Sequence, residues 1–217
     1  MSTLMAPSIS AYPRRVVPPI STCSEVRSPP TSLLPRGRAL FWEGDHHADK
    51  MLVVEGVVRA VRLLENGNRQ ILAFYWPGDV VRPTQASCQQ FTAEAVTNCR
   101  VVRSPVASIC QSGEPCGAHQ VLTDTLSLVV TMSQKNSIAR IAAFLLRIRR
   151  HLPTDPKRPH ALLMMIPRAD IADHVGTSLE TVCRTLAEFK AKGLIDMPNR
   201  KTITYLNLPG LIRIAGD

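Results

Sequence analysis

Residues 166–213 decide the fold of this chain and read IPRADIADHVGTSLETVCRTLAEFKAKGLIDMPNRKTITYLNLPGLIR. Pro167 suits the first turn of a helix, because a residue there needs no backbone N–H donor. Gly176 suits the position after that helix, where a left-handed conformation is required, and Ser178 can cap a second helix. Apolar residues then recur at three- and four-residue spacing, namely Val182, Leu186 and Phe189. The stretch therefore predicts two helices joined by a tight turn.

The residues after the second helix predict a β-hairpin. Gly193 ends the helix, and two short alternating segments, residues 194–196 and 202–206, flank a turn that contains Pro and Asn. The turn also contains Arg200 and Lys201, as a loop beside DNA phosphates would. Together these elements predict a winged helix-turn-helix, which presents one helix to the major groove of DNA. An ordinary helical subdomain with a solvated charged face is the alternative.

Longer motifs carry a family resemblance. Residues 170–195, DIADHVGTSLETVCRTLAEFKAKGLI, resemble the DNA-binding domain of the CRP/FNR superfamily of bacterial transcription regulators. Residues 35–58, PRGRALFWEGDHHADKMLVVEGVV, resemble the start of that superfamily's β-roll sensor domain, and the Pro-Gly-Asp at 77–79 resembles a later turn of the roll. The resemblance extends over roughly residues 33–213. It implies an α+β fold with a cyclic-nucleotide-binding-like β-roll, a long dimerisation helix and a C-terminal winged helix-turn-helix.

We expect four parts along the chain. Residues 1–32 are rich in Pro and Ser and predict a mobile tail. Turn signals recur every ten or so residues in 33–118, which is typical of a small antiparallel roll. Residues 119–152 change to the pattern of a long helix, and residues 153–217 form the DNA-binding domain. The branch that the chain resembles within the superfamily is that of FixK.

The long helix carries two apolar stripes. They are Leu122, Leu126 and Val129, and then Ile138, Ile141, Leu145 and Ile148. A long exposed helix commonly buries such a stripe against a symmetry mate, and the resemblance implies that this helix forms a homodimer. Asn136 lies between the stripes and is our candidate for setting the register at the dimer seam. Packing on the roll of the same chain is the alternative, and both arrangements can hold on different faces.

Charge is concentrated in the C-terminal part. The net charge is +9; residues 135–217 have 14 Lys+Arg and 7 Asp+Glu, a balance of +7, which leaves +2 for residues 1–134. An excess of positive charge around the predicted reading helix fits a polyanionic partner. The sequence contains no run of eighteen apolar residues, so we expect no membrane span. We expect a cytoplasmic protein.

The second helix has a face that can read bases. In the superfamily a helix glutamate and the arginine four residues later contact base edges, and these positions match Glu180 and Arg184. Glutamate accepts a hydrogen bond from cytosine N4, whereas arginine donates to guanine O6 and N7. Leu179 precedes the glutamate and offers only an apolar contact, suited to a thymine methyl group. Cys183 lies on the same face and is a further candidate for a base contact. We therefore expect a palindrome of the TTGAT-N4-ATCAA kind, rather than TGTGA half-sites.

Five residues are candidates for contacts with DNA phosphates: Arg168, Thr177, Ser178, Arg200 and Lys201. Simple helix capping or solvated charge is the alternative for each of them. The resemblance also implies that the bound dimer recruits RNA polymerase, so we expect an activator in the main.

The sensor function of the roll is weakly supported. Cyclic-nucleotide binders of the superfamily carry an arginine that pairs with the cyclic phosphate. The corresponding segment here, residues 90–94, places Phe91 at that position. A buried phosphate would then lack its charged partner, which is costly. We do not expect cyclic AMP as a ligand.

Other cofactors are not expected either. An iron–sulfur cluster needs four cysteine thiolates, but the six cysteines are scattered without a C-x-x-C pair: Cys23, Cys88, Cys99, Cys110, Cys116 and Cys183. Candidate haem ligands are His46, His47, Cys88 and His119. Exposed histidines in a turn need no such role. We expect a regulator without cofactor or metal and no enzyme activity. The alternative is an effector-gated regulator whose roll binds a small molecule or haem.

Cys183 offers a possible means of control. It precedes Arg184 on the reading face, and positive charge beside a thiol favours the reactive thiolate form. Oxidation to a sulfinate would place negative charge against DNA phosphates. We therefore hypothesise redox inactivation at Cys183. The alternative is a small residue that fits the groove.

Overall fold

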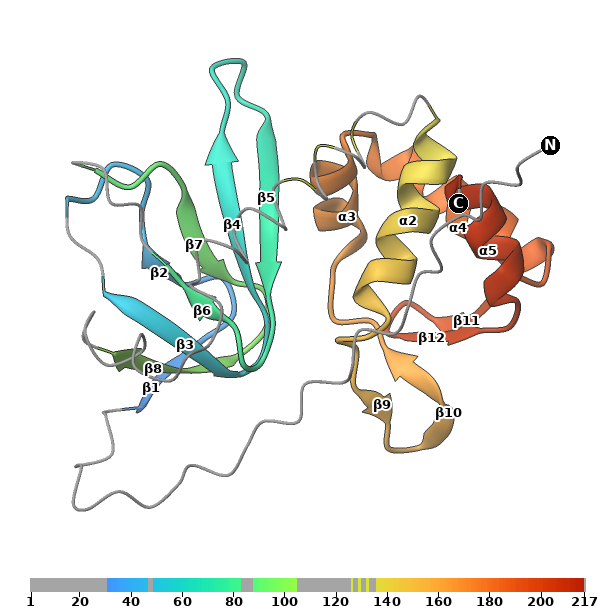
Figure 1. Ribbon diagram of the computed structural model, residues 1–217, viewed down its shortest axis with the longest axis horizontal. Helices are drawn as coiled ribbons and strands as arrows, with labels where there is room; N and C mark the ends of the chain where they lie inside the picture. The colour runs from blue at the N-terminus through green and yellow to red at the C-terminus, as the bar shows by residue number, and fades with distance from the viewer. Residues whose placement is uncertain are drawn as a thin grey trace, which may run out of the picture.

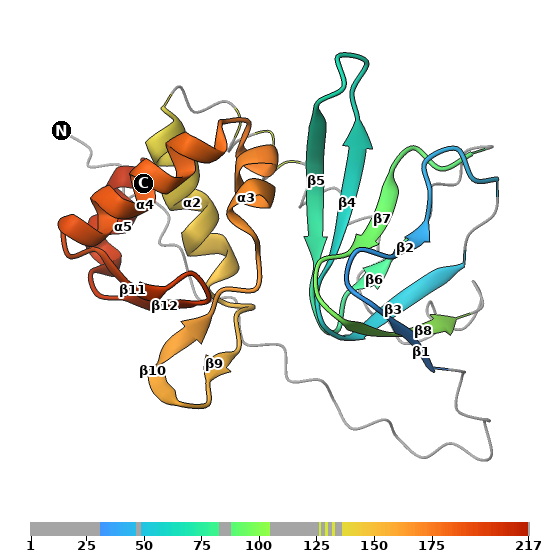
Figure 2. The ribbon, with the colours of Figure 1, turned by 180° about the vertical axis from the view of Figure 1, so that it is seen from behind.

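The computed structural model describes residues 31–46, 49–82, 88–104 and 136–216, together with Leu126, Val129 and Met132. Figure 1 shows a β-roll beside a second domain of helices and short strands, and Figure 2 shows the same pair from behind. Within the described ranges, no helix is long and apolar enough to cross a membrane.

The roll consists of two four-stranded sheets of antiparallel neighbours. One sheet has the order β1 (Thr31–Leu34), β8 (Cys99–Ser104), β3 (Lys50–Glu55) and β6 (Val80–Val81). The other has the order β2 (Ala39–Phe41), β7 (Thr92–Ala95), β4 (Val58–Leu63) and β5 (Arg69–Tyr75). The predicted roll is thus present. Its first strand begins at Thr31, so the last two residues of the predicted tail belong to β1.

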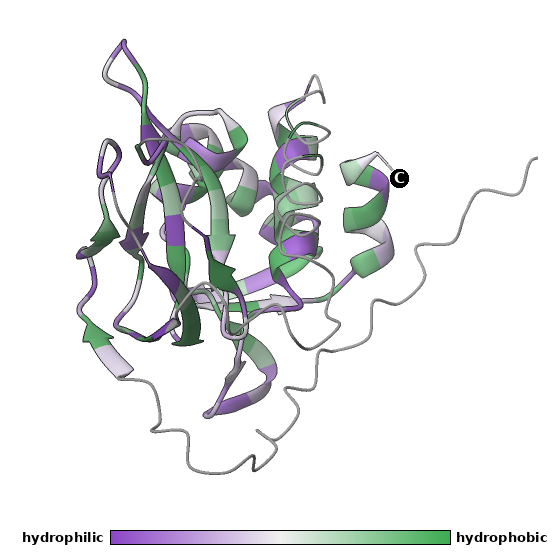
Figure 3. Ribbon diagram, turned by 60° about the vertical axis from the view of Figure 1, so that its left-hand side comes forward, coloured by the Kyte–Doolittle hydropathy of each residue, from purple (hydrophilic) through white to green (hydrophobic). Residues whose placement is uncertain are grey.

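Alternation along the strands produces the core of the roll. Figure 3 shows hydrophobic and hydrophilic residues alternating along these strands, as expected when one face of each sheet is buried. Val53, Val58 and Val81 are fully buried between the sheets, and Phe91 packs edge-on against Phe41 at 5.3 Å between ring centroids. The β4–β5 hairpin turns at Asn66-Gly67, where Gly67 has a φ of 78°, the left-handed conformation that a tight hairpin turn requires.

The second domain combines four helices with a third sheet. The helices are α2 (Ser137–Ile148), α3 (Arg168–Val175), α4 (Leu179–Ala191) and α5 (Leu208–Ala215). The sheet has the order β11 (Ile195–Asn199), β12 (Thr202–Tyr205), β10 (Arg158–Leu163) and β9 (Thr154–Asp155). The two helices and the hairpin predicted for residues 166–206 are therefore observed. Helix α5 and the β9–β10 hairpin were not predicted.

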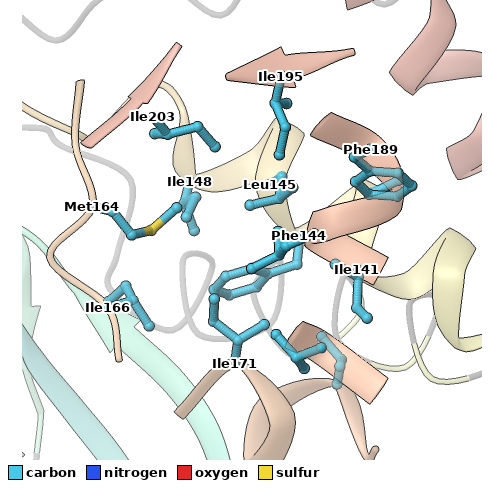
Figure 4. Packing of buried hydrophobic residues seen from close by; sticks show 14 of the residues in the cluster. Ile141, Phe144, Leu145, Ile148, Met164, Ile166, Ile171, Phe189, Ile195 and Ile203 are labelled. Atoms are coloured by element: carbon cyan, nitrogen blue, oxygen red, sulfur yellow. The ribbon is translucent and has the colours of Figure 1, made fainter. Parts of the chain in front are cut away.

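Helix α2 belongs to the core of this second domain. Figure 4 shows Phe144 and Leu145 of α2 surrounded by Ile171, Phe189 and Ile195 from three other elements. All five are at most 1% exposed. The hydroxyl of Tyr205 on β12 also donates to the carbonyl of Leu145 at 2.8 Å, and burial raises the pKa of this tyrosine. Helix α2 is therefore an internal element of the domain.

This arrangement corrects part of the predicted dimerisation helix. The second stripe packs within the same chain: Ile138, Ile141, Leu145 and Ile148. These residues are apolar because they face the core of their own domain. Periodicity shows that a helix face is buried, but it cannot distinguish burial within the chain from burial against a second copy. Leu126 and Val129 of the first stripe are helical and more than half exposed, and Leu122 lies outside the described residues.

Asn136 has a role within the chain that the sequence did not predict. Its backbone is extended, with φ −103° and ψ 123°, and its side-chain oxygen accepts a hydrogen bond from the Ile138 backbone N–H at 2.9 Å. Asparagine in this position caps the start of a helix. Helix α2 therefore begins at Ser137 rather than continuing the helix to which Leu126 and Val129 belong, and a role of Asn136 in the dimer seam stays a prediction.

The two domains meet where α3 lies beside β5 in both views (Figures 1 and 2), and Phe74 of β5 also packs against Phe144 of α2. Arg59 donates to Glu94 at 2.9 Å and to Asp170 at 2.5 Å, whereas Arg69 donates to Asp173 at 2.6 Å and to Asp170 at 3.4 Å. We call these five residues the interdomain ion-pair cluster. Burial by itself lowers the pKa of Arg59, but Glu94 and Asp170 outweigh it and raise the pKa above its ordinary value.

His174 of α3 is buried at the centre of the same interface. Its Nδ1 lies 2.9 Å from the carbonyl oxygen of Ile71 in β5, and its Nε2 contacts the guanidinium of Arg147 in α2. Its ring packs 5.3 Å from both Phe74 of the roll and Phe144 of α2. Burial, with a smaller contribution from the Arg147 charge, lowers its pKa to about 3. His174 is therefore neutral, with Nδ1–H as donor and Nε2 as acceptor.

Replacing Asn136 separates the capping role from a role in the dimer seam. Asn136→Ala should lower the free energy of unfolding by about 1 kcal/mol, because α2 loses its N-terminal cap. Asn136→Ser, which can also cap, should restore most of this loss. Denaturant unfolding at several protein concentrations measures both quantities. A change in dimer dissociation constant with no change in unfolding of the DNA-binding domain would contradict the capping role.

The buried imidazole predicts a loss of stability in mild acid. Folded His174 takes up a proton only near pH 3, whereas an unfolded histidine does so near pH 6.5, so below pH 6.5 the unfolded state binds more protons. The linkage costs about 2 kcal/mol of stability at pH 5 relative to neutral pH. In His174→Gln the fall between pH 7.5 and 5, measured by denaturant unfolding, should be smaller by that amount.

The control for this experiment is His160→Gln, at an exposed position of β10. It should leave the pH dependence of the parent unchanged. An equal loss of stability in the parent and in His174→Gln would show that the acid sensitivity arises elsewhere.

Candidate DNA-binding site

The turn between α3 and α4 fixes the relative direction of the two helices. Gly176 has a φ of 65°, and its backbone N–H caps α3 by donating to the Ala172 carbonyl. A Cβ atom at this position would lie 2.8 Å from Met132 Cε, so space as well as conformation favours glycine. Two residues later Ser178 caps α4, accepting from the Thr181 backbone N–H at 3.1 Å. Only three residues therefore join the two helices, as the sequence predicted.

The predicted base-reading residues share the exposed side of α4. Leu179 is 49% exposed, and Glu180 and Arg184 are exposed as well. Cys183 lies between them and is partly buried. The opposite face packs in the domain core through Val182, Leu186 and Phe189. Glutamate and arginine four residues apart on a helix point to one side, so both can reach the same groove.

An exposed leucine at the start of a helix is itself informative. Burial of Leu179 would add to the stability of the chain, yet half of the side chain faces solvent. A leucine in a major groove makes apolar contact with thymine methyl groups and offers no hydrogen bond to guanine. Its exposure is consistent with an apolar contact to a partner.

Arg168 lies at the start of α3, next to the reading face. Its Nη1 is 3.5 Å from the Cys183 sulfur on α4, so the guanidinium spans the two helices. Thr177 is partly buried in the turn and Ser178 is exposed. The Ser178 hydroxyl takes part in the cap described above, so the capping role considered as an alternative for this residue is present.

The hairpin β11–β12 forms the wing, with Arg200 and Lys201 exposed at its tip. The Lys201 N–H donates to the Asn199 side chain at 2.8 Å, which tightens the turn. The Lys201 carbonyl accepts from the Met164 backbone N–H at 2.8 Å, and Met164 lies in the segment that leads into α3. The basic tip is therefore held near the start of α3, where Arg168 lies.

The residues that join this domain to the roll were missed by sequence reasoning. Asp170 lies in the first turn of α3, where the helix dipole favours a carboxylate, but its side chain is 3% exposed and paired with arginines of β4 and β5. Arg59 and His174 were not singled out at all. Arg59 pairs with Asp170 and His174 contacts the Ile71 carbonyl, each across more than 100 residues, and a local pattern cannot reveal such pairs. The one signal in the sequence was that charged and polar residues occupy positions of α3 among its apolar residues, which indicates a polar contact on that helix.

The described residues also bear on the cofactors. Among them, no three His, Cys, Asp or Glu side chains are grouped to hold a metal ion. Cys99 and Cys183 are free thiols, and burial raises the pKa of Cys99. Phe91, at the position that would pair with a cyclic phosphate, is partly buried against the roll core. Cys88 and His46 lie within the described part of the roll, whereas five other candidates lie outside the described residues: Cys23, Cys110, Cys116, His47 and His119.

The geometry defines a class of protein: a β-roll docked on a winged helix-turn-helix whose second helix is exposed for DNA. Comparisons with known proteins agree. Residues 139–214 match the family of Crp-like helix-turn-helix domains, and residues 32–111 match the family of cyclic nucleotide-binding domains. The first of these ranges includes most of α2, as the packing of α2 in the second domain requires.

Individual relatives point the same way. The nitrogen fixation regulation protein FixK of Azorhizobium caulinodans is 29% identical over 99% of this chain and 87% of its own length. The fumarate and nitrate reduction regulatory protein of Escherichia coli K12 is 25% identical over 83% of the chain and 76% of its own length. The structure of FixK2 from Bradyrhizobium japonicum superposes with a TM-score of 0.76 at 24% identity, covering 87% of this chain and 98% of that one.

The chain belongs to the CRP/FNR superfamily of transcription regulators and is FixK-like. Regulators of this superfamily bind DNA, act as dimers and are not enzymes. The predicted fold class and the predicted membership are therefore confirmed.

Proposed function

We propose that this regulator binds a palindrome of the form TTGAT-N4-ATCAA as a homodimer and without a bound cofactor. The observation that carries the proposal is the common exposed face of Leu179, Glu180 and Arg184 on α4. An apolar residue followed by a carboxylate and a guanidinium matches thymine, cytosine and guanine in that groove. Arg168, Thr177, Ser178, Arg200 and Lys201 are the proposed phosphate contacts around this face.

Dimerisation would use the helix before α2. Leu126 and Val129 are helical and more than half exposed, so their spacing leaves an apolar stripe for a second copy. Two reading helices would then contact half-sites about one turn of DNA apart. The corresponding cellular role is a cytoplasmic regulator, mainly an activator, that recruits RNA polymerase.

Independence from a cyclic nucleotide has support in the roll. A cyclic phosphate needs a charged partner when it is buried, and Phe91 supplies an aromatic ring that packs on Phe41 instead. The proposed regulator therefore responds to its own abundance rather than to a nucleotide.

Titration of DNA tests the specificity. Metal-free protein without added effector should bind a TTGAT-N4-ATCAA duplex in preference to a TGTGA-type duplex, measured by fluorescence anisotropy at fixed salt. Glu180→Ala should weaken binding to the first duplex by about 1–3 kcal/mol, because one base contact is lost. Glu188→Ala is the matched control, since Glu188 is a glutamate of the same helix that pairs with Lys192.

The opposite preference, or equal loss in both variants, would contradict the proposed reading face. Failure of the parent on both duplexes would favour the effector-gated alternative, in which the roll must first bind a small molecule or haem.

We further infer that oxidation at Cys183 switches off DNA binding. The Cys183 sulfur lies 3.5 Å from the Arg168 guanidinium and beside the reading residues. Hydrogen peroxide oxidises a cysteine thiolate to a sulfenate, and a second peroxide oxidises the sulfenate to a sulfinate, with release of one water at each step. The added oxygen atoms would enlarge and charge the side chain where it must face DNA.

Peroxide treatment tests this inference. Brief exposure to hydrogen peroxide should weaken DNA binding of the parent at least tenfold, because the sulfinate repels phosphates. Cys183→Ser should bind DNA equally well before and after treatment. The control Cys88→Ser, at a partly buried position of the roll, should remain as sensitive as the parent. Equal losses in the parent and Cys183→Ser would show that oxidation acts elsewhere.

A further inference from the structure

The interdomain ion-pair cluster lies behind the reading helix rather than on it. Asp170, Asp173 and His174 occupy one face of α3 by their spacing of three and four residues, and this face meets the roll. Asp170 is paired with arginines from two neighbouring strands of the roll, and Asp173 with one of them. A charged, hydrogen-bonded contact of this kind has a narrow geometry, so it defines how α3 is turned against β5.

The orientation of α3 determines that of α4. Helix α3 contacts β5 as well as α4, and the turn at Gly176 leaves only three residues between the helices. Both helices are also buried in one core around Phe144. The pair therefore moves as a unit, and a rotation of α3 on the roll would carry Leu179, Glu180 and Arg184 with it.

The cluster also reaches the part of the roll that corresponds to the nucleotide-binding segment. Glu94 follows Phe91 by three residues and accepts a hydrogen bond from Arg59 at 2.9 Å. Arg59 in turn donates to Asp170 at 2.5 Å. The two carboxylates hold one guanidinium, whose side chain is 12% exposed. A continuous line of contacts thus runs from β7 through β4 to α3.

We propose that Arg59, Arg69, Asp170 and Asp173 are positioning residues for DNA binding: they lock α3 on the roll in the orientation that presents α4 to DNA. The inference rests on the proposed function and explains how a roll without a bound effector can hold the reading helix in place. The locked arrangement leaves the reading face exposed, so it is compatible with DNA binding rather than inhibitory.

Charge reversal at Asp173 distinguishes positioning from simple attraction. Asp173→Arg adds two positive charges to a DNA-binding domain, and attraction to phosphates alone would therefore tighten DNA binding. It also places two guanidinium groups against each other at the position of the 2.6 Å bond between Arg69 and Asp173. If these pairs are lost, a smaller fraction of molecules presents α4 to DNA. The apparent affinity for DNA falls in proportion to that fraction. The two effects have opposite signs.

The experiment uses the full-length protein and the duplex that binds it best. Asp173→Arg should weaken DNA binding about tenfold, which corresponds to a tenfold fall in the locked population. The combined swap Arg69→Glu with Asp173→Arg restores an opposite-charge pair at these two positions but loses the contact of Arg69 with Asp170, so it should recover part of the lost affinity. Asp196→Arg is the matched control, because it makes the same charge change on the same domain at the carboxylate that pairs with Lys190. It should bind as tightly as the parent or more tightly.

Amide hydrogen exchange provides a readout that does not depend on DNA. Asp173→Arg should speed exchange in β5 and α3 and leave the β1–β8 pair of the roll unchanged, and the swap should reverse this. Arg69→Gln serves in the same way if Asp173→Arg is unstable. Unchanged exchange at the interface, tighter DNA binding by Asp173→Arg, or no rescue by the swap would each overturn the proposal. Failure of the parent to bind any duplex would instead contradict the proposed function, while the exchange data still decide whether the lock exists.

Discussion

Phe144 is the residue on which the two domains converge. Its ring is 1% exposed and lies 5.9 Å from Phe74 of the roll and 5.3 Å from His174 of α3, with the Arg147 guanidinium 5.8 Å above it. It also sits in the core that α2 shares with α3 and α4 (Figure 4). Removing such a ring typically costs about 3–5 kcal/mol. The wing, the reading helix and the contact with the roll therefore all depend on one desolvated aromatic side chain.

Around this apolar centre, polar contacts supply direction rather than net stability. Desolvating Arg59 and Asp170 offsets much of their attraction, although removing one partner alone would leave a buried charge. Packed aromatic rings tolerate a small rotation of one domain on the other. Hydrogen bonds do not: Arg59 is shared by two carboxylates, and the His174 imidazole has two fixed partners. The apolar contact holds the domains together, and the polar contacts define one relative orientation.

Much of the DNA-binding domain could be predicted because its signals are local. Gly176, Ser178 and the spacing from Val182 to Phe189 specify conformation and burial within a few residues, and these predictions are confirmed. The stripe from Ile138 to Ile148 was assigned to the wrong partner, since periodicity shows that a face is buried but not against what. Asp170 had no local signal, because its partners come from distant strands. The base contacts of Glu180 remain a prediction, since they depend on a molecule outside the chain.

The cap at Asn136 has a consequence for how such a regulator can be divided and recombined. Since α2 fills the centre of the C-terminal core, the natural boundary between modules lies at Asn136 and not after α2. A fragment cut at residue 153 would lose Phe144 and Leu145 and expose the apolar sides of four elements. A module exchanged at Asn136 would carry its complete core, but it would need a roll with arginines at the positions of Arg59 and Arg69. The unit that can be exchanged is therefore the helix-capped domain together with the charges of the surface on which it rests.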